Sequence, residues 1–194
     1  MINSLNVFSD SGLILQNKRK IKRQLLNSGQ DFLEKRIAIL SGSTIGEIAD
    51  MIEIFLLSNG IKPVFWKGNY NRFYEDAVFN IDGFLEFNPD IVYIHTSCRN
   101  ISSFPKFGTS VEEFSTMINN EISRYNEVWE VINEKTNAAI IQNNFEMLPY
   151  RVLGNSEVYR LDGMLNYINH LNDLIYDYAV HHSNFFVNDI AYQA

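Results

Sequence analysis

The sequence contains little cysteine and no long hydrophobic run, and these two absences exclude several classes of protein. A single cysteine, Cys98, among 194 residues excludes an internal disulfide, which is typical of proteins from a reducing compartment. No stretch approaches the roughly 18 uninterrupted apolar residues that are needed to span a bilayer. The first residues also lack the charged start, apolar core and cleavage site of a signal peptide. We therefore expect a cytoplasmic protein without a membrane span.

Metal-ligand spacing and excess positive charge are also lacking. One cysteine and four histidines form no CxxC or HxxxH pattern, so no metal site is predicted. The formal net charge of −7 makes nucleic acid an unfavourable partner. The local exception is the basic run at 18–23. This run is either a patch for phosphate or a membrane surface, or the solvated face of a helix.

The remaining composition is that of an ordinary globular protein, with 46% hydrophobic and 20% charged residues. Short apolar runs alternate with amphipathic helical patterns, which predicts βαβ units. We expect a three-layer, flavodoxin-like α/β domain at 31–194 with a parallel sheet of about five strands. An N-terminal extension at 1–30 should carry a basic helix at 17–30, and 67–88 should be a structured connection with one short helix. The predicted strands are 36–40, 61–66, 91–94, 137–142 and 185–187, and the predicted long helices are 45–58, 110–135 and 163–181.

Ligands of such sheets bind outside the carboxyl ends of the strands. The loops expected at that end of the sheet are 41–46, 67–76, 95–109, 143–160 and 188–194.

The first of these loops contains Ser41, Gly42, Ser43 and Thr44 between a strand and a helix. Small residues permit a sharp turn and leave amide groups free at the helix N-terminus, an arrangement that favours an anion or oxyanion. A hydroxyl of Ser43 or Thr44 is either a nucleophile here or a simple cap of the following helix.

The third loop begins with His95 and continues to Asn100. His95 is interpreted either as a residue bonded to a loop carbonyl or as an oxyanion donor or general base. Arg99 is suited to clamp a carboxylate or phosphate, and Asn100 to donate an amide hydrogen bond. Cys98 is a candidate nucleophile only if its pKa is lowered.

Other polar residues follow the remaining strands. Asparagines in such loops either hold the backbone in place or face a ligand. Asp189 is interpreted either as orienting a histidine or as capping a following helix. The other residues expected near this end of the sheet are Asn69, Asn71, Asn143, Asn144, Arg151 and Asn155.

An ordered set of segments resembles the N-terminal domain of FkbH-like proteins of the haloacid dehalogenase superfamily. The resemblance runs from about residue 30 to the end of the chain. The segments that carry it are Ile37–Gly46, Gly60–Pro63, Gly68–Asn71, Pro89–Thr96 and Arg151–Asn155.

This resemblance implies an SGNH-hydrolase-like fold followed by a phosphatase-type domain that uses magnesium. Members of the family load a glyceryl unit from a phosphorylated three-carbon donor onto an acyl carrier protein thiol, or act in surface-polysaccharide pathways. The resemblance therefore implies as partners an acyl carrier protein, a phosphatase-type domain and a small acyl or glyceryl group. This chain lacks the DxDxT-type motif, so we expect no cofactor here and magnesium only in a phosphatase-type domain that this chain does not contain.

The SGNH blocks carry over only in part. The GDS block falls on Ser41-Gly42-Ser43, which gives Ser43 the nucleophile position without the aspartate. The third block places Arg99 at its asparagine position and Asn100 one residue later. No histidine follows Asp189 at the DxxH spacing, so His95 would have to act as the base.

These matches give Ser43, His95 and Asn100 as candidate catalytic residues. The candidate substrate-binding residues are Ser41, Gly42, Thr44, Gly68, Asn69, Asn71, Arg99, Arg151 and Asn155. Three functions follow: a domain for acyl or glyceryl transfer, a docking module that has lost the chemistry, or a GDSL-type esterase.

Overall fold

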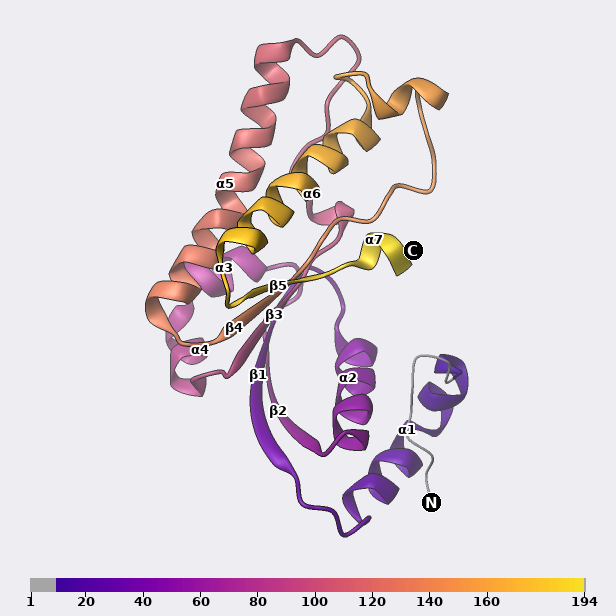
Figure 1. Ribbon diagram of the computed structural model, residues 1–194, viewed down its shortest axis with the longest axis vertical. Coiled ribbons are helices and arrows are strands. Elements are labelled where there is room, and N and C mark those ends of the chain that lie inside the picture. Colours follow the sequence, from indigo (N-terminus) through magenta and orange to yellow (C-terminus); the bar gives the residue numbers. More distant parts are fainter. Residues whose placement is uncertain (1–9, 194) are drawn as a thin grey trace.

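Five parallel strands form one sheet in the order β2-β1-β3-β4-β5 (Figure 1). The computed structural model describes residues 10–193. The parallel α/β architecture predicted from the sequence is confirmed, and the strand order is that of flavodoxin-like folds. The strands are β1 Leu33–Ser41, β2 Ile61–Lys67, β3 Ile91–His95, β4 Ala139–Asn143 and β5 Phe185–Asn188.

Helices cover the two faces of the sheet unequally. In Figure 1, α3, α4, α5 and α6 lie on one side of the strands, and α1 and α2 lie on the other. The helices are α1 Ser11–Leu26, α2 Gly46–Ser58, α3 Phe73–Val78, α4 Ile81–Phe87, α5 Val111–Lys135, α6 Met164–His181 and α7 Ile190–Gln193, with 3-10 helices η1 Cys98–Asn100 and η2 Gly154–Val158.

The main core fills the side of α3 to α6. Leu40 and Ile94 from the sheet are buried there together with Trp129 of α5. The smaller core on the α2 side contains Ile39 and Tyr93. Phe186 of β5 is 53% exposed, because α2 packs over β1 and β2. Alternate residues of a strand face opposite sides, so Tyr93 and His95 both belong to the α2 side.

Two predictions about local structure were wrong in extent. The first helix is Ser11–Leu26 rather than 17–30, because the Asp10 carboxylate caps it by accepting the N–H of Leu13. The connection 67–88 contains two short helices instead of one. They are separate because the N–H groups of Phe79 and Asn80 both bond to the carbonyl of Glu75, which ends α3.

Two further local features concern α5 and α1. The Ser110 hydroxyl and the Glu113 carboxylate form a capping box at the start of α5. The basic run of α1 forms ion pairs with α2, in which Lys18 contacts Asp50 and Lys22 contacts Glu53. These pairs favour the interpretation of the run as a helix face. Among residues 10–193, no helix is long and apolar enough to cross a membrane.

Candidate functional site

The turn after β1 is held tightly to the loop after β3. The N–H of Gly42 donates to the carbonyl of His95 at 2.8 Å. A Cβ atom on Gly42 would lie 2.6 Å from Asn100 Oδ1 and 2.8 Å from the His95 carbonyl oxygen. Only glycine therefore permits this approach of the two loops.

Asn100 joins three of the expected loops. Its Nδ2 donates to the Gly42 carbonyl at 2.7 Å and to Asn71 Oδ1 at 2.9 Å, and its Oδ1 accepts the N–H of Ser97 at 2.9 Å. Asn71 occupies the left-handed region with φ of 53°. Of the predicted site residues, the structure thus brings Gly42, Asn71 and Asn100 together at the carboxyl end of the sheet.

Ser43 lies half-buried in this turn, and Thr44 is exposed. The Ser41 hydroxyl donates to the carbonyl of Ser43. The capping interpretation of Ser43 and Thr44 is wrong, because the N-cap of α2 is Ile45 and no side chain caps that helix. The cause is that α2 begins two residues beyond the hydroxyl-bearing turn. Within residues 10–193 the Ser43 hydroxyl forms no hydrogen bond with a histidine or a carboxylate.

The loop after β2 is fixed by a buried carboxylate. Asp76 accepts hydrogen bonds from the backbone N–H of Asn69 at 2.6 Å and from its Nδ2 at 3.0 Å. Gly68 donates its N–H to the Ile39 carbonyl at 2.9 Å. Asn69 therefore supports the loop, the first of the two roles considered for these asparagines.

A second group of polar side chains lies at the ends of β3, β4 and β5, on the α2 side of the sheet. Asn143 is at its centre, with Nδ2 at 3.1 Å from His95 Nδ1 and at 3.0 Å from the carbonyl oxygen of Thr96. Its Oδ1 accepts from the Tyr93 hydroxyl at 2.9 Å and from Asn188 Nδ2 at 2.8 Å. We call Tyr93, His95, Asn143 and Asn188 the amide cluster.

Sequence reasoning missed Tyr93 and Asn188 and gave Asn143 only a general loop role. The strand ends hold the missing signal: each residue of the amide cluster occupies the last or next-to-last position of its strand that faces the α2 side. Tyr93 and His95 are two residues apart, and Asn143 is paired with Asn188 in the register. Aligning the carboxyl ends of the predicted strands would have grouped them.

The surroundings of His95 and Cys98 favour the uncharged forms of both side chains. Burial lowers the pKa of His95, against an opposing effect of Glu146. Burial, the hydrogen bond to Glu146 and the charge of Glu146 raise the pKa of Cys98 to about 12. The Cys98 thiol donates to Glu146 Oε1 at 3.2 Å. The condition for Cys98 as a nucleophile, a lowered pKa, is therefore not met.

Two arginines lie beside Asn100, in a pocket of about 300 Å³. Arg99 is exposed, and its role as a clamp for a carboxylate or phosphate stays a prediction. Arg124, which sequence reasoning missed, donates from one nitrogen to the Asn100 carbonyl and to Glu121 Oε1, both at 2.6 Å. Arg124 therefore positions the Asn100 loop, with its charge paired to the buried Glu121.

The remaining predicted residues lie further along the chain. Arg151 and Asn155 are exposed, Arg151 before η2 and Asn155 within it, and among the described residues no hydrogen bond joins them to the amide cluster or to Gly42. Asp189 accepts from Asn144 Nδ2 at 2.6 Å and from the N–H of Tyr192 at 3.2 Å. Of the two interpretations of Asp189, the structure favours the cap of the last helix.

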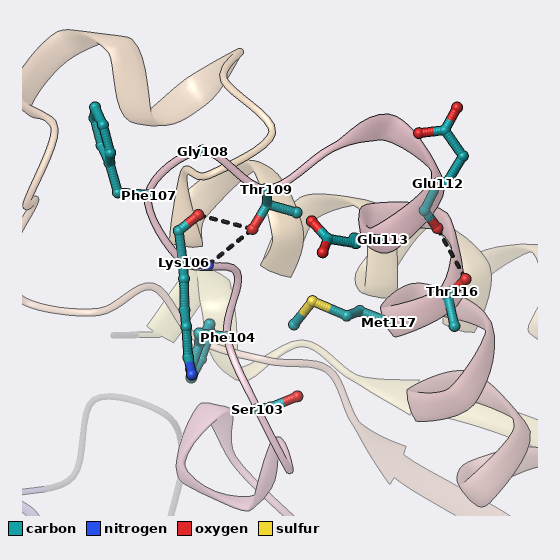
Figure 2. A pocket seen from close by; sticks show the side chains of 10 residues that line it. All are labelled: Ser103, Phe104, Lys106, Phe107, Gly108, Thr109, Glu112, Glu113, Thr116 and Met117. Carbon is teal, nitrogen blue, oxygen red and sulfur yellow. Dashed lines mark hydrogen bonds between the residues drawn. The ribbon is translucent and has the colours of Figure 1, made fainter.

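The loop 95–109 also lines a wide pocket of about 700 Å³ at the start of α5, which Figure 2 shows. In this pocket the Lys106 N–H donates to the Thr109 hydroxyl oxygen, and that hydroxyl donates to the Lys106 carbonyl. Phe107 is 85% exposed and lies under the guanidinium of Arg160. The pocket contains none of the predicted site residues. We therefore place the candidate site at Gly42 and the amide cluster.

The described residues contain no cluster of side chains that could ligate a metal ion. No group of three or more histidine, cysteine, aspartate or glutamate side chains within 10–193 is arranged to hold a metal ion. The described residues do not fit the magnesium of a phosphatase-type domain.

Comparison with protein-family models and with curated proteins gives no match. A solved structure does match: the N-terminal part of the protein BF1531 from Bacteroides fragilis, which contains a phosphatase domain and is complexed with magnesium. The TM-score is 0.71 at 15% sequence identity, over 90% of this chain and 45% of that chain. At this identity the likeness concerns the fold alone, and the present chain spans less than half of that structure.

Proposed function

We propose that this chain is the SGNH-like domain of a cytoplasmic, FkbH-like biosynthetic protein. In this proposal the carboxyl end of its sheet binds an acyl or glyceryl group, or the acyl carrier protein that presents it, without cleaving the group. A phosphatase-type domain performs the phosphoryl chemistry. The solved neighbour supports this division, because it contains a phosphatase domain and this chain spans only 45% of it.

The observation that carries the docking role is the isolation of Ser43. A serine hydroxyl at its ordinary pKa is a weak nucleophile, and it needs an adjacent base. Among residues 10–193 no base is bonded to Ser43, and His95 Nδ1 faces Tyr93 and Asn143 instead. These contacts support docking over transfer through Ser43 and over a GDSL-type esterase.

Binding is tested by calorimetric titration of the chain with acyl carrier protein carrying a free thiol, an acyl group or a glyceryl group. We expect binding that is at least about fivefold weaker in Arg99→Glu, since reversing a charge at an interface rim costs about 1 kcal/mol or more. Arg19→Glu, on the exposed face of α1, is the matched control and should bind normally. No binding by any form of the carrier would refute the docking role.

Catalysis is tested separately with a fluorophosphonate and a p-nitrophenyl ester. We expect no labelling of Ser43 and no burst. Labelling that disappears in Ser43→Ala, with that variant still folded, would replace the docking role with transfer or esterase chemistry.

A further inference from the structure

The amide cluster determines which nitrogen of His95 carries the proton. A neutral imidazole has one N–H donor and one acceptor nitrogen, and the partner of one nitrogen selects the tautomer. His95 Nδ1 has two neighbours in the cluster, the Tyr93 hydroxyl at 3.1 Å and Asn143 Nδ2 at 3.1 Å. The assignment depends on which of them donates.

Thr96 fixes the orientation of the Asn143 amide. Its backbone carbonyl can only accept, so the group 3.0 Å from it must be the Asn143 NH2. One of the two amide hydrogens is directed to Thr96, and the other to His95 Nδ1. Asn143 Oδ1 then receives the Tyr93 hydroxyl and Asn188 Nδ2. Every polar atom of the buried Asn143 side chain is thereby satisfied.

A proton on His95 Nδ1 would break this arrangement. It would face the second N–H of Asn143, and a buried donor would lose its acceptor, which is unfavourable. With Nδ1 unprotonated, the second N–H of Asn143 has its acceptor. The one hydrogen of the Tyr93 hydroxyl is directed to Asn143 Oδ1, so Tyr93 is not the donor to Nδ1 in this arrangement. We propose that Asn143 is a positioning residue that holds His95 as the Nε2–H tautomer, so that His95 donates a hydrogen bond to a ligand oxygen and is not a base.

The tautomer of His95 is a property of the free protein and does not depend on the proposed function. It determines the chemistry available here, because the half-buried His95 then presents an N–H donor for a carbonyl or anionic oxygen. The titratable groups around it are Tyr93 on the same strand, Cys98 in η1 and Glu146 after β4, with Glu146 bonded to Cys98. Asp189 after β5 is bonded to Asn144.

The other histidines provide internal controls. His170, His181 and His182 each have Nδ1 within 2.7–2.8 Å of a backbone carbonyl oxygen, four residues earlier in the chain. A carbonyl only accepts, so these three should be Nδ1–H tautomers when neutral. Among the four histidines of the sequence, His95 is the single one expected to differ.

The test is a long-range ¹H–¹⁵N correlation spectrum of the full chain with labelled histidine, at a pH where the imidazoles are neutral. The His95 signals are assigned by their loss in His95→Gln. We expect the Nε2–H pattern for His95 and the Nδ1–H pattern for the other three. An Nδ1–H pattern for His95 would overturn the proposal.

Two variants separate Asn143 from Tyr93. Asn143→Asp replaces the donor with a carboxylate, so we expect the proton to move to Nδ1 and the proton affinity of His95 to rise about tenfold or more. Tyr93→Phe leaves the Asn143 donor in place and should keep the Nε2–H pattern. A change of tautomer in Tyr93→Phe would assign the control to the hydroxyl and refute the role of Asn143. If Asn143→Asp does not fold, the wild-type and Tyr93→Phe spectra still decide the question.

Discussion

The two halves of the candidate site are built in different ways. The half at the end of β1 is a backbone structure, in which Gly42 meets the carbonyl of His95 and one amide of Asn100 ties the loops together. The half at the ends of β3 to β5 is a side-chain network centred on the buried Asn143. The first half fixes the distance between two loops, and the second fixes the hydrogen-bond partners of His95. A tight glycine turn and a buried side-chain network therefore meet at the same end of the sheet.

The largest effect should come from breaking the backbone half with Gly42→Ala. The new Cβ would lie under 3 Å from both Asn100 Oδ1 and the His95 carbonyl oxygen, so the loops must separate. We expect the free energy of unfolding to fall by about 3 kcal/mol in urea denaturation, as for other overpacked sites. Gly46→Ala is the matched control, because nothing lies within 4 Å of its Cβ position. Equal stability of the two variants would contradict the close approach.

The second largest effect should come from Asn143→Ala in the side-chain half. The substitution leaves the Thr96 carbonyl and the Tyr93 hydroxyl without their buried partner. We expect a loss of about 2 kcal/mol in the free energy of unfolding, since stranded buried polar groups bear their full desolvation cost. A loss below about 0.5 kcal/mol would mean that water replaces the amide.

Asn100→Ala should have a smaller effect, which sharpens the contrast between the halves. Asn100 is only half-buried and its partner Asn71 is exposed, so water can replace part of what is lost. We expect a loss of about 1 kcal/mol in the same denaturation experiment. A larger loss than in Asn143→Ala would reverse the ranking of the two halves.

The same contrast explains how much the sequence could predict. The parallel sheet and the turn at Ser41–Thr44 follow from local patterns, since apolar runs and small residues report directly on strands and sharp turns. The capping box of Ser110 and Glu113 is equally local. The amide cluster depends on the register of three strands, because Asn143 and Asn188 are 45 residues apart. Local patterns do not carry that register.

Burial explains the other differences. Cys98 lies in a loop after a strand, a position where a reactive thiol could face a ligand. Burial and the neighbouring Glu146 raise the pKa of its thiol. The Glu146 contact joins segments 48 residues apart. Likewise, the capping interpretation of Ser43 or Thr44 fails because α2 begins at Gly46. The predicted helix 45–58 begins one residue before the observed α2, which moves the N-cap from Thr44 to Ile45, an ordinary error for helix boundaries.

The smallest expected effect is the dependence of stability on pH through His95. Burial lowers the pKa of His95 in the folded protein below the ordinary value of 6.5, while Glu146 acts in the opposite direction. The unfolded chain therefore binds more protons between these two pKa values, so stability is full above pH 6.5 and falls as the pH decreases through that window.

In His95→Gln this part of the pH dependence should disappear, whereas His181→Gln, at an exposed position of α6, should retain it. Urea denaturation of the three proteins between about pH 5 and pH 7.5 measures the difference. Identical pH profiles for wild type and His95→Gln would show that folding leaves the proton affinity of His95 unchanged. The side-chain half of the site would then not differ from water in its effect on this imidazole.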